Sequence, residues 1–301
     1  MRPPGWLRRR RRSARAREAT GGLHAFVVVR YSILTSDGTG YSLANQLDQD
    51  SYREQLFAAS RLHAHERLFC GLTLPSLAGQ QPPPDPSWFT LLVLTSTELP
   101  DAHRQTLDAA LAPHPWAEVV ALRPEAADVG QAVREEIRTR LAHRREPTTY
   151  LTTRLDDDDA LSLAFFAHLW PYVIRDLVGF AISPAAGYAA LVDEGAGRLE
   201  AVHELDYPKA AQGLSFVNRY DPAADAFAVP PASVFELGNH DKVDRRRPTI
   251  LDARRRLYVR TFHQASTQHL LKGERHRKRY VRGEPVDLDD LAASFDLRAL
   301  R

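Results

Sequence analysis

Apolar and polar positions follow one another along this chain in the order typical of strands separated by helices. Five apolar residues in a row at Ala25–Val29 fit a strand that is covered on both faces. Further strands are expected at 89–94, 119–122 and 149–153, and helices at 61–77, 101–111 and 128–143. This alternation predicts an α/β fold with a mostly parallel mixed sheet flanked by helices.

The pattern changes after residue 160. Residues 160–177 are expected to be helical with a break at Pro171, and 187–192 with 199–203 resemble a hairpin. Two more strands are expected at 214–219 and 257–262. The sequence therefore predicts a C-terminal α+β part.

Composition excludes several classes of protein. The 301 residues contain one cysteine, Cys70, which rules out an intramolecular disulfide framework and a Cys-rich zinc site. Residues 1–20 hold eight arginines against one glutamate, but no apolar stretch follows them as it would in a secretory signal. No segment approaches the roughly 20 apolar residues of a membrane span. We expect a cytoplasmic protein whose disordered basic arm, residues 1–22, associates weakly with anionic membrane surfaces.

Four aspartates, Asp156–Asp159, follow directly on the strand expected at 149–153. Adjacent carboxylates repel one another, and a hard divalent cation such as Mn²⁺ or Mg²⁺ relieves that repulsion through oxygen ligands. The end of a strand is also where an open α/β sheet places its ligand crevice. A solvated acidic turn is the alternative, and the apolar residues on both sides of the run argue against it.

Other chemistries that use aspartate clusters fit less well. Ala160 occupies the fifth position, where a haloacid-dehalogenase-type phosphatase needs Thr or Val, and the Asp-Asp-x-x-Asp spacing of isoprenoid enzymes is absent. A calcium loop would need a glycine turn and a distal glutamate. A short Asp-x-Asp that bridges a divalent ion to a diphosphate remains.

The order of elements resembles the glycosyltransferase A-type fold, and within it the bacterial putative rhamnosyltransferase family. Five segments carry the resemblance, which covers roughly residues 24–270: Val29–Ser32, Arg67–Phe69, Thr73–Leu77 with Gln80, Thr152–Asp156, and Asp158 with Asp159. It implies a catalytic domain at 23–270, with a nucleotide-sugar-binding half at 23–160 and an acceptor half at 161–270. A partly helical tail would follow at 271–301.

The resemblance also implies the roles of site residues. Asp156 and Asp158 would bind the metal and the donor's ribose or diphosphate, and Asp159 would either face the donor sugar or support these ligands from behind. The run does not by itself say which of its carboxylates touch the metal. His263, at the end of the strand expected at 257–262, would complete the metal site. Arg30 and Arg154 would approach the nucleotide or its phosphates, although a surface ion pair is an equal alternative for Arg30.

An inverting sugar transfer needs a general base beside the acceptor hydroxyl. Residues 234–241 contain three residues that could act as this base, Glu236, His240 and Asp241. We predict Glu236 or Asp241. The implied activity is metal-dependent transfer of a sugar, named rhamnose by the family, from a nucleotide-diphospho-sugar to a glycan or lipid-linked acceptor.

A second hypothesis is a noncatalytic phosphate- or nucleic-acid-binding protein. Residues 242–282 hold fourteen basic residues against three acidic ones, and together with the arm they could bind a phosphate backbone. The arm lacks interleaved aromatic residues, and no nucleic-acid motif occurs in the chain. No specific nucleic acid is therefore expected as a partner.

Overall fold

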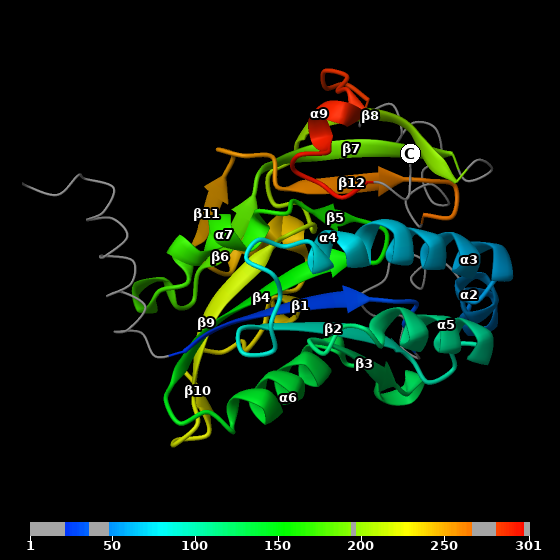
Figure 1. Ribbon diagram of the computed structural model, residues 1–301. Coiled ribbons are helices and arrows are strands. Elements are labelled where there is room, and N and C mark those ends of the chain that lie inside the picture. The colour runs from blue at the N-terminus through cyan, green and yellow to red at the C-terminus, as the bar shows by residue number, and fades with distance from the viewer. Residues whose placement is uncertain (1–21, 36–47, 194–196, 267–280, 298–301) are drawn as a thin grey trace, which may run out of the picture.

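A large mixed sheet runs through the computed structural model, which describes residues 22–35, 48–193, 197–266 and 281–297 (Figure 1). Within these residues the sheet has eight strands in the order β11-β6-β9-β4-β1-β2-β3, and β10 pairs with β9. Strands β4, β1, β2 and β3 are parallel, whereas β9 is antiparallel to both β4 and β6. The predicted α/β class with a mostly parallel mixed sheet is confirmed.

The strands of the large sheet are β1 (Leu23–Arg30), β2 (Phe89–Ser96), β3 (Ala117–Leu122), β4 (Thr148–Asp156), β6 (Ala181–Pro184), β9 (Ser215–Asp221), β10 (Ala226–Phe227) and β11 (Thr249–Asp252). The α-helices are α2 (Gln49–Leu56), α3 (Ala59–Leu68), α4 (Leu74–Ala78), α5 (Asp101–Leu111), α6 (Val129–Leu141), α7 (Phe165–Leu169) and α9 (Leu288–Leu291). A π-helical turn at Phe69–Thr73 joins α3 to α4.

A second sheet lies on the far side of α3 and α4 from the large sheet (Figure 1). Its described strands are β5 (Ala160–Leu161), β12 (Tyr258–Phe262), β7 (Ala186–Asp193) and β8 (Arg198–Asp206), in that order. Helix α9 covers this sheet through Leu291, which is buried with Phe295 and Leu297. The second sheet and its cover form the predicted α+β part.

Strand β1 shows why the large sheet is covered on both faces. Ala25, Val27 and Val29 pack into the core that contains residues of α3, α4 and α5. Phe26 and Val28 pack into the core that contains residues of α6. Because side chains alternate along a strand, each face of β1 carries an apolar row. The same alternation decides which way the polar residues at the strand ends point.

Two regions depart from the sequence predictions or lie beyond the described residues. Instead of one helix at 160–177, the chain forms the short strand β5, helix α7 and two 3-10 turns, because Ala160 and Leu161 pair with β12. The basic arm falls outside the described residues except for residue 22, as do residues 194–196 of the hairpin and 267–280 at the junction with the tail.

His24 gives the fold a pH dependence. Its ring is buried, and its Nε2 lies 2.9 Å from Thr90 Oγ1. Burial, and then the nearby Arg144 guanidinium, lower the pKa of His24 to about 3. The unfolded chain takes up a proton near pH 6.5 whereas the folded chain does not, so this contribution to stability is present above pH 6.5 and is lost as the pH falls toward 3.

We expect the free energy of unfolding to fall by about 3 kcal/mol between pH 7 and pH 4 through His24 alone. The variant His24→Gln keeps a polar side chain but cannot titrate, so its unfolding free energy should depend less on pH by that amount. Urea unfolding of both proteins at pH 7, 5.5 and 4 measures the difference. Parallel pH profiles for the two proteins would show that His24 is not the titrating group.

Candidate functional site

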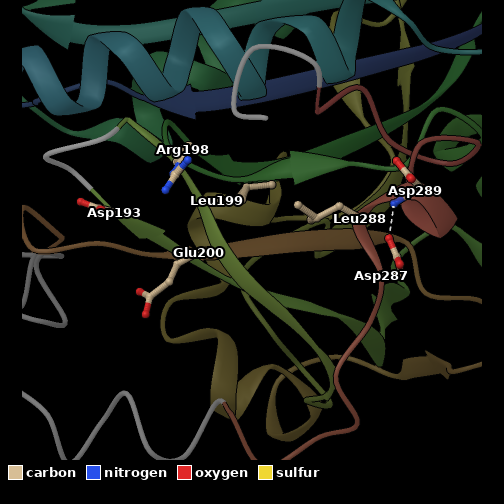
Figure 2. A pocket seen from close by; sticks show the side chains of 7 residues that line it. All are labelled: Asp193, Arg198, Leu199, Glu200, Asp287, Leu288 and Asp289. Atoms are coloured by element: carbon tan, nitrogen blue, oxygen red, sulfur yellow. Dashed lines mark hydrogen bonds between the residues drawn. The ribbon is translucent and has the colours of Figure 1, made fainter.

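One surface depression lies away from the aspartate run. It has a volume of about 540 Å³ and lies between β8 and the segment that begins α9 (Figure 2). Its lining residues are Asp193, Arg198, Leu199, Glu200, Asp287, Leu288 and Asp289. None of the site residues expected from the sequence lines this depression.

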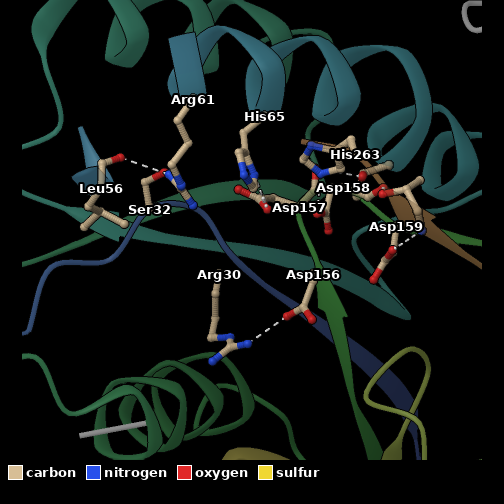
Figure 3. Close-up of polar contacts among 12 residues, drawn as sticks. Arg30, Ser32, Leu56, Arg61, His65, Asp156, Asp157, Asp158, Asp159 and His263 are labelled. Atoms are coloured by element: carbon tan, nitrogen blue, oxygen red, sulfur yellow. Dashed lines mark hydrogen bonds and ion pairs between the residues drawn. The ribbon is translucent and has the colours of Figure 1, made fainter. Parts of the chain in front are cut away.

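The ends of β1 and β4 bring three of the expected donor-binding residues together. Arg30 and Asp156 are direct partners in the parallel register of these strands. Arg30 Nη2 donates to Asp156 Oδ1 at 2.8 Å, and Arg154 Nη2 lies 3.5 Å from the same oxygen. Arg154 precedes Asp156 by two residues, so both side chains leave the same face of β4. Two guanidinium groups thus converge on one carboxylate at the carboxyl ends of these strands, and Figure 3 shows the Arg30 contact.

The electrostatics of Asp156 follow from this arrangement. Burial by itself would raise the pKa of the Asp156 carboxyl, but the Arg154 and Arg30 guanidinium groups outweigh burial and hold its pKa far below the usual value. Asp156 is therefore ionised across the physiological pH range.

After β4 the chain turns toward α3, and the next two aspartates each bind a histidine. Asp157 Oδ1 lies 2.9 Å from His65 Nδ1, and Asp158 Oδ2 lies 2.9 Å from His263 Nε2. The backbone of the turn is fixed as well, because Thr73 Oγ1 donates to Asp157 O and Thr261 Oγ1 donates to Asp158 O. Helix α3 and strand β12 thus hold the aspartate turn between them.

A cluster of ligand atoms results from these contacts. One potential ligand atom from each of His65, Asp158 and His263 lies within 4.8 Å of the other two. Ligand atoms about 2.1 Å from a shared metal are separated by about 3 to 4 Å, so a small inward movement would let all three bind one ion. His65 Nε2 and Asp157 Oδ2 are buried without a hydrogen-bond partner among the described residues. The two imidazoles, the Asp158 carboxylate and the unsatisfied His65 Nε2 fit a divalent metal ion.

Asp156 lies apart from the other two residues predicted to bind the metal, Asp158 and His263. The sequence prediction grouped Asp156 with Asp158 and His263, but the structure turns Asp156 toward Arg30, away from the histidines (Figure 3). Strand alternation keeps Asp156 on the face of Arg154, whereas Asp158 lies beyond the strand end. The four aspartates therefore do not converge on one point, and separate partners relieve most of their repulsion.

The last aspartate of the run, Asp159, contacts residues of the protein interior. It is buried, with Gln212 Nε2 donating to Oδ2 at 2.5 Å and Thr261 N donating to Oδ1 at 2.8 Å. Burial, followed by the charges of Asp158 and Asp156, raises the pKa of Asp159 well above its usual value. Asp159 thus links the turn that follows β4 to strand β12 in the protein interior.

Glu236 is one of the two residues predicted as the general base. Its Oε2 accepts hydrogen bonds from the backbone N–H groups of Ala232 and Ser233, and its other oxygen forms an ion pair with Arg134 of α6. Ser233 and Glu236 form a capping box on the 3-10 helix at Val234–Leu237. Both carboxylate oxygens thus have structural partners, and the S-x-x-E spacing is a sequence signal for that role.

His240 and Asp241 lie closer to the charged residues at the sheet edge. Burial and then the Arg154 charge lower the pKa of His240, while the charge of Asp156 acts in the opposite direction. Asp241 Oδ1 lies 3.4 Å from both His240 Nδ1 and Tyr207 Oη, and its side chain is 54% exposed. Tyr207 in turn lies under the Arg260 guanidinium. This group, which we call the acceptor-side cluster, consists of Tyr207, His240, Asp241 and Arg260.

Several arginines of the basic stretch 242–282 have internal partners. Arg246 donates to Leu237 O, Arg254 binds Asp252, and Arg256 binds both Glu204 and Asp206. Most of their charge is therefore compensated within the protein.

Two residues that the sequence analysis did not identify stand beside the aspartate turn. His65 and Arg61 are one helical turn apart on α3, and Arg61 Nη1 donates to Ser32 Oγ at 3.0 Å (Figure 3). Burial lowers the pKa of Arg61, and the carboxylates of Asp157 and Asp158 oppose that effect. The i, i+4 spacing on α3 was a signal, but nothing in the sequence connects this helix with residues near 157.

Residues 24–273 match the protein family described as putative rhamnosyl transferase. No curated protein matches the chain. Among the part of the chain that the structure describes, no helix has the length and apolar character needed to cross a membrane.

Similar solved structures have low identity to this chain. S. aureus TarS 1-349 in complex with UDP-GlcNAc is 10% identical with a TM-score of 0.37, and the match covers 83% of this chain and 61% of that chain. A 4-diphosphocytidyl-2C-methyl-D-erythritol synthase is 11% identical with a TM-score of 0.34, with 84% and 95% covered. A putative glucose-1-phosphate thymidylyltransferase from Bacillus anthracis is 9% identical with a TM-score of 0.31, with 87% and 98% covered.

Proposed function

The chain belongs to the putative rhamnosyl transferase family and is a glycosyltransferase, and we propose that it is a metal-dependent enzyme that uses a nucleotide-diphospho-sugar donor. The proposed acceptor is a hydroxyl group of a glycan or of a lipid-linked glycan, and the proposed sugar is rhamnose, after the family. The proposed stereochemical course is inversion.

One observation carries this proposal: a cationic pair and a potential metal site lie side by side at the end of β4. Arg30 and Arg154 both contact Asp156. Asp158, two residues later, forms the ligand cluster with His65 and His263. A diphosphate needs compensation of several negative charges, which fixed guanidinium groups and a divalent ion provide together. The carboxyl ends of parallel strands are also where such a fold binds its ligand.

The chain's own residues would act on the two sides of the reacting sugar. Arg30 and Arg154 would orient the diphosphate, with Asp156 holding both guanidinium groups in place. Asp158 and His263, with His65 beside them, would hold the divalent ion. When bound, that ion would stabilise the negative charge on the departing nucleoside diphosphate.

The acceptor-side cluster would supply the base. Asp241 is the most exposed member of this cluster and therefore the most accessible to an incoming hydroxyl group, and Tyr207 Oη donates to its Oδ1 at 3.4 Å. In the proposed step the acceptor oxygen attacks the anomeric carbon and its proton passes to Asp241. The bond from that carbon to the diphosphate oxygen breaks, and the electron pair leaves with the nucleoside diphosphate.

Thermal stability in the presence of nucleotides tests the proposed function directly. A ligand at 100 times its Kd adds about 2.7 kcal/mol to the stability of the native state, which corresponds to roughly 5 °C in Tm. We expect one of UDP, dTDP and GDP to raise the Tm by this amount with Mn²⁺ or Mg²⁺ present, and to do so much less with EDTA. AMP serves as the control nucleotide.

The outcomes separate the parts of the proposal. A shift that is the same with EDTA would remove metal dependence and leave the nucleotide-sugar donor. No shift with any nucleoside diphosphate, with or without metal, would contradict the nucleotide-diphospho-sugar donor.

A further inference from the structure

His65 and Asp157 form a buried pair beside the potential metal site, and the reaction proposed above gives Asp157 no role. Their side chains are 5% and 7% exposed, and Nδ1 of the histidine lies 2.9 Å from Oδ1 of the aspartate. The carboxylate can only accept, so Nδ1 carries the proton and donates it. In the neutral ring the lone pair then lies on Nε2.

That Nε2 atom has no hydrogen-bond partner among the described residues, although it is buried. Leaving a buried polar atom unsatisfied is destabilising, so a ligand at this atom would stabilise the site. The imidazole rings of His65 and His263 stand edge to face, with centroids 5.3 Å apart, and Asp158 lies against both histidines (Figure 3). The unsatisfied atom therefore belongs to the same cluster as Asp158 and His263.

We propose that His65 is a metal ligand of this enzyme and that Asp157 is its positioning residue, so that the site has two imidazoles and one carboxylate. This rests on the metal-dependent function proposed above and specifies its ligands. A carboxylate that holds the Nδ1–H of a histidine presents Nε2 to a metal, and this arrangement commonly raises metal affinity 10- to 100-fold. The two neighbouring aspartates thus have different roles: Asp157 orients the His65 imidazole, and Asp158 binds the ion.

The ligand set also predicts which ions bind. Mg²⁺ and Ca²⁺ prefer oxygen ligands, whereas imidazole nitrogen favours transition metals, with affinity rising from Mn²⁺ through Co²⁺. A site with two imidazoles should therefore bind Co²⁺ more tightly than Mn²⁺, and both far more tightly than Mg²⁺. An all-carboxylate site at the same aspartates would discriminate much less.

Direct metal binding to the full chain, without donor or acceptor, tests the inference. Isothermal titration with Mn²⁺ and Co²⁺ should give a Kd raised at least about 10-fold in His65→Gln and about 10- to 100-fold in Asp157→Asn. His63→Gln is the matched control, because His63 lies two residues away on α3 and its Nδ1 is bound to Ala59 O at the exposed surface. Its Kd should equal that of the wild type.

Nitrogen couplings in pulsed electron paramagnetic resonance of bound Mn²⁺ provide a readout on the wild-type protein alone. Two coupled imidazoles are expected in the wild type and one in His65→Gln. A single coupled imidazole in the wild type, or unchanged Kd values in both variants, would overturn the role of His65 even if one variant folds poorly. If the wild type binds no metal while a nucleotide still raises the Tm, the metal site fails and the transferase proposal survives.

Discussion

Replacing Asp158 by asparagine is expected to reduce sugar transfer by at least about 10³-fold while leaving the protein folded. In the proposed mechanism the metal would contribute several kcal/mol to stabilising the departing diphosphate, and a 10³-fold reduction corresponds to about 4 kcal/mol of activation free energy. Asp158 supplies the one carboxylate of the three-residue cluster, so its loss should empty or weaken the site. The rate is measured as release of nucleoside diphosphate from a sugar donor that carries the nucleotide identified by thermal shift.

Structural damage must be separated from the chemical effect. The Asp158 carboxylate binds His263, and this hydrogen bond, together with the His263 charge, outweighs burial and lowers the pKa of Asp158. The asparagine amide has nearly the same shape as the carboxylate and can still form a hydrogen bond with His263. We therefore expect the Tm to change by only a few degrees. Asp101→Asn, an exposed carboxylate at the start of α5, is the control and should retain full activity. Full turnover by Asp158→Asn would remove this residue from the site.

The sequence predicted the parallel half of the fold well because its elements are long and periodic. Helix α5 has the expected bounds, and strands β1, β2 and β4 lie within a few residues of theirs. The second sheet was predicted only in part, since β5 has two residues and too few side chains to show a period of two. Its pairing with β12, almost a hundred residues later, is a tertiary contact with no local signal.

For the candidate site as well, the sequence predicted what depends on local pattern and missed what depends on contacts between distant residues. Arg30 and Asp156 could be predicted as neighbours because both end adjacent parallel strands, and their register confirms that geometry. His65 could not be predicted, since 92 residues separate it from Asp157. Asp159 looked like a site residue from its neighbours in sequence, but Gln212 and Thr261 occupy its oxygens. Adjacent aspartates in a turn point in different directions, and only tertiary structure determines those directions.

The second large effect is expected from Asp241→Asn, which should reduce kcat by about 10² to 10⁴-fold through loss of the general base. Nucleotide binding should be unchanged, because Arg30, Arg154 and the metal cluster are intact. The variant should therefore show the wild-type Tm shift with nucleoside diphosphate and metal, together with the reduced rate. That combination separates a defect in acceptor activation from a defect in donor binding.

Glu236→Gln is the matched comparison, because the sequence offered both carboxylates for the same role. Its capping hydrogen bonds and its ion pair with Arg134 assign Glu236 to the fold. We expect kcat within about twofold of wild type and a loss of about 1 kcal/mol in unfolding free energy. The opposite result, with Asp241→Asn active and Glu236→Gln inactive at full nucleotide binding, would restore Glu236 as the base. If His240→Gln loses kcat while Asp241→Asn keeps it, the proton passes to the imidazole, whose Nδ1 is held by Lys209 O at 2.6 Å.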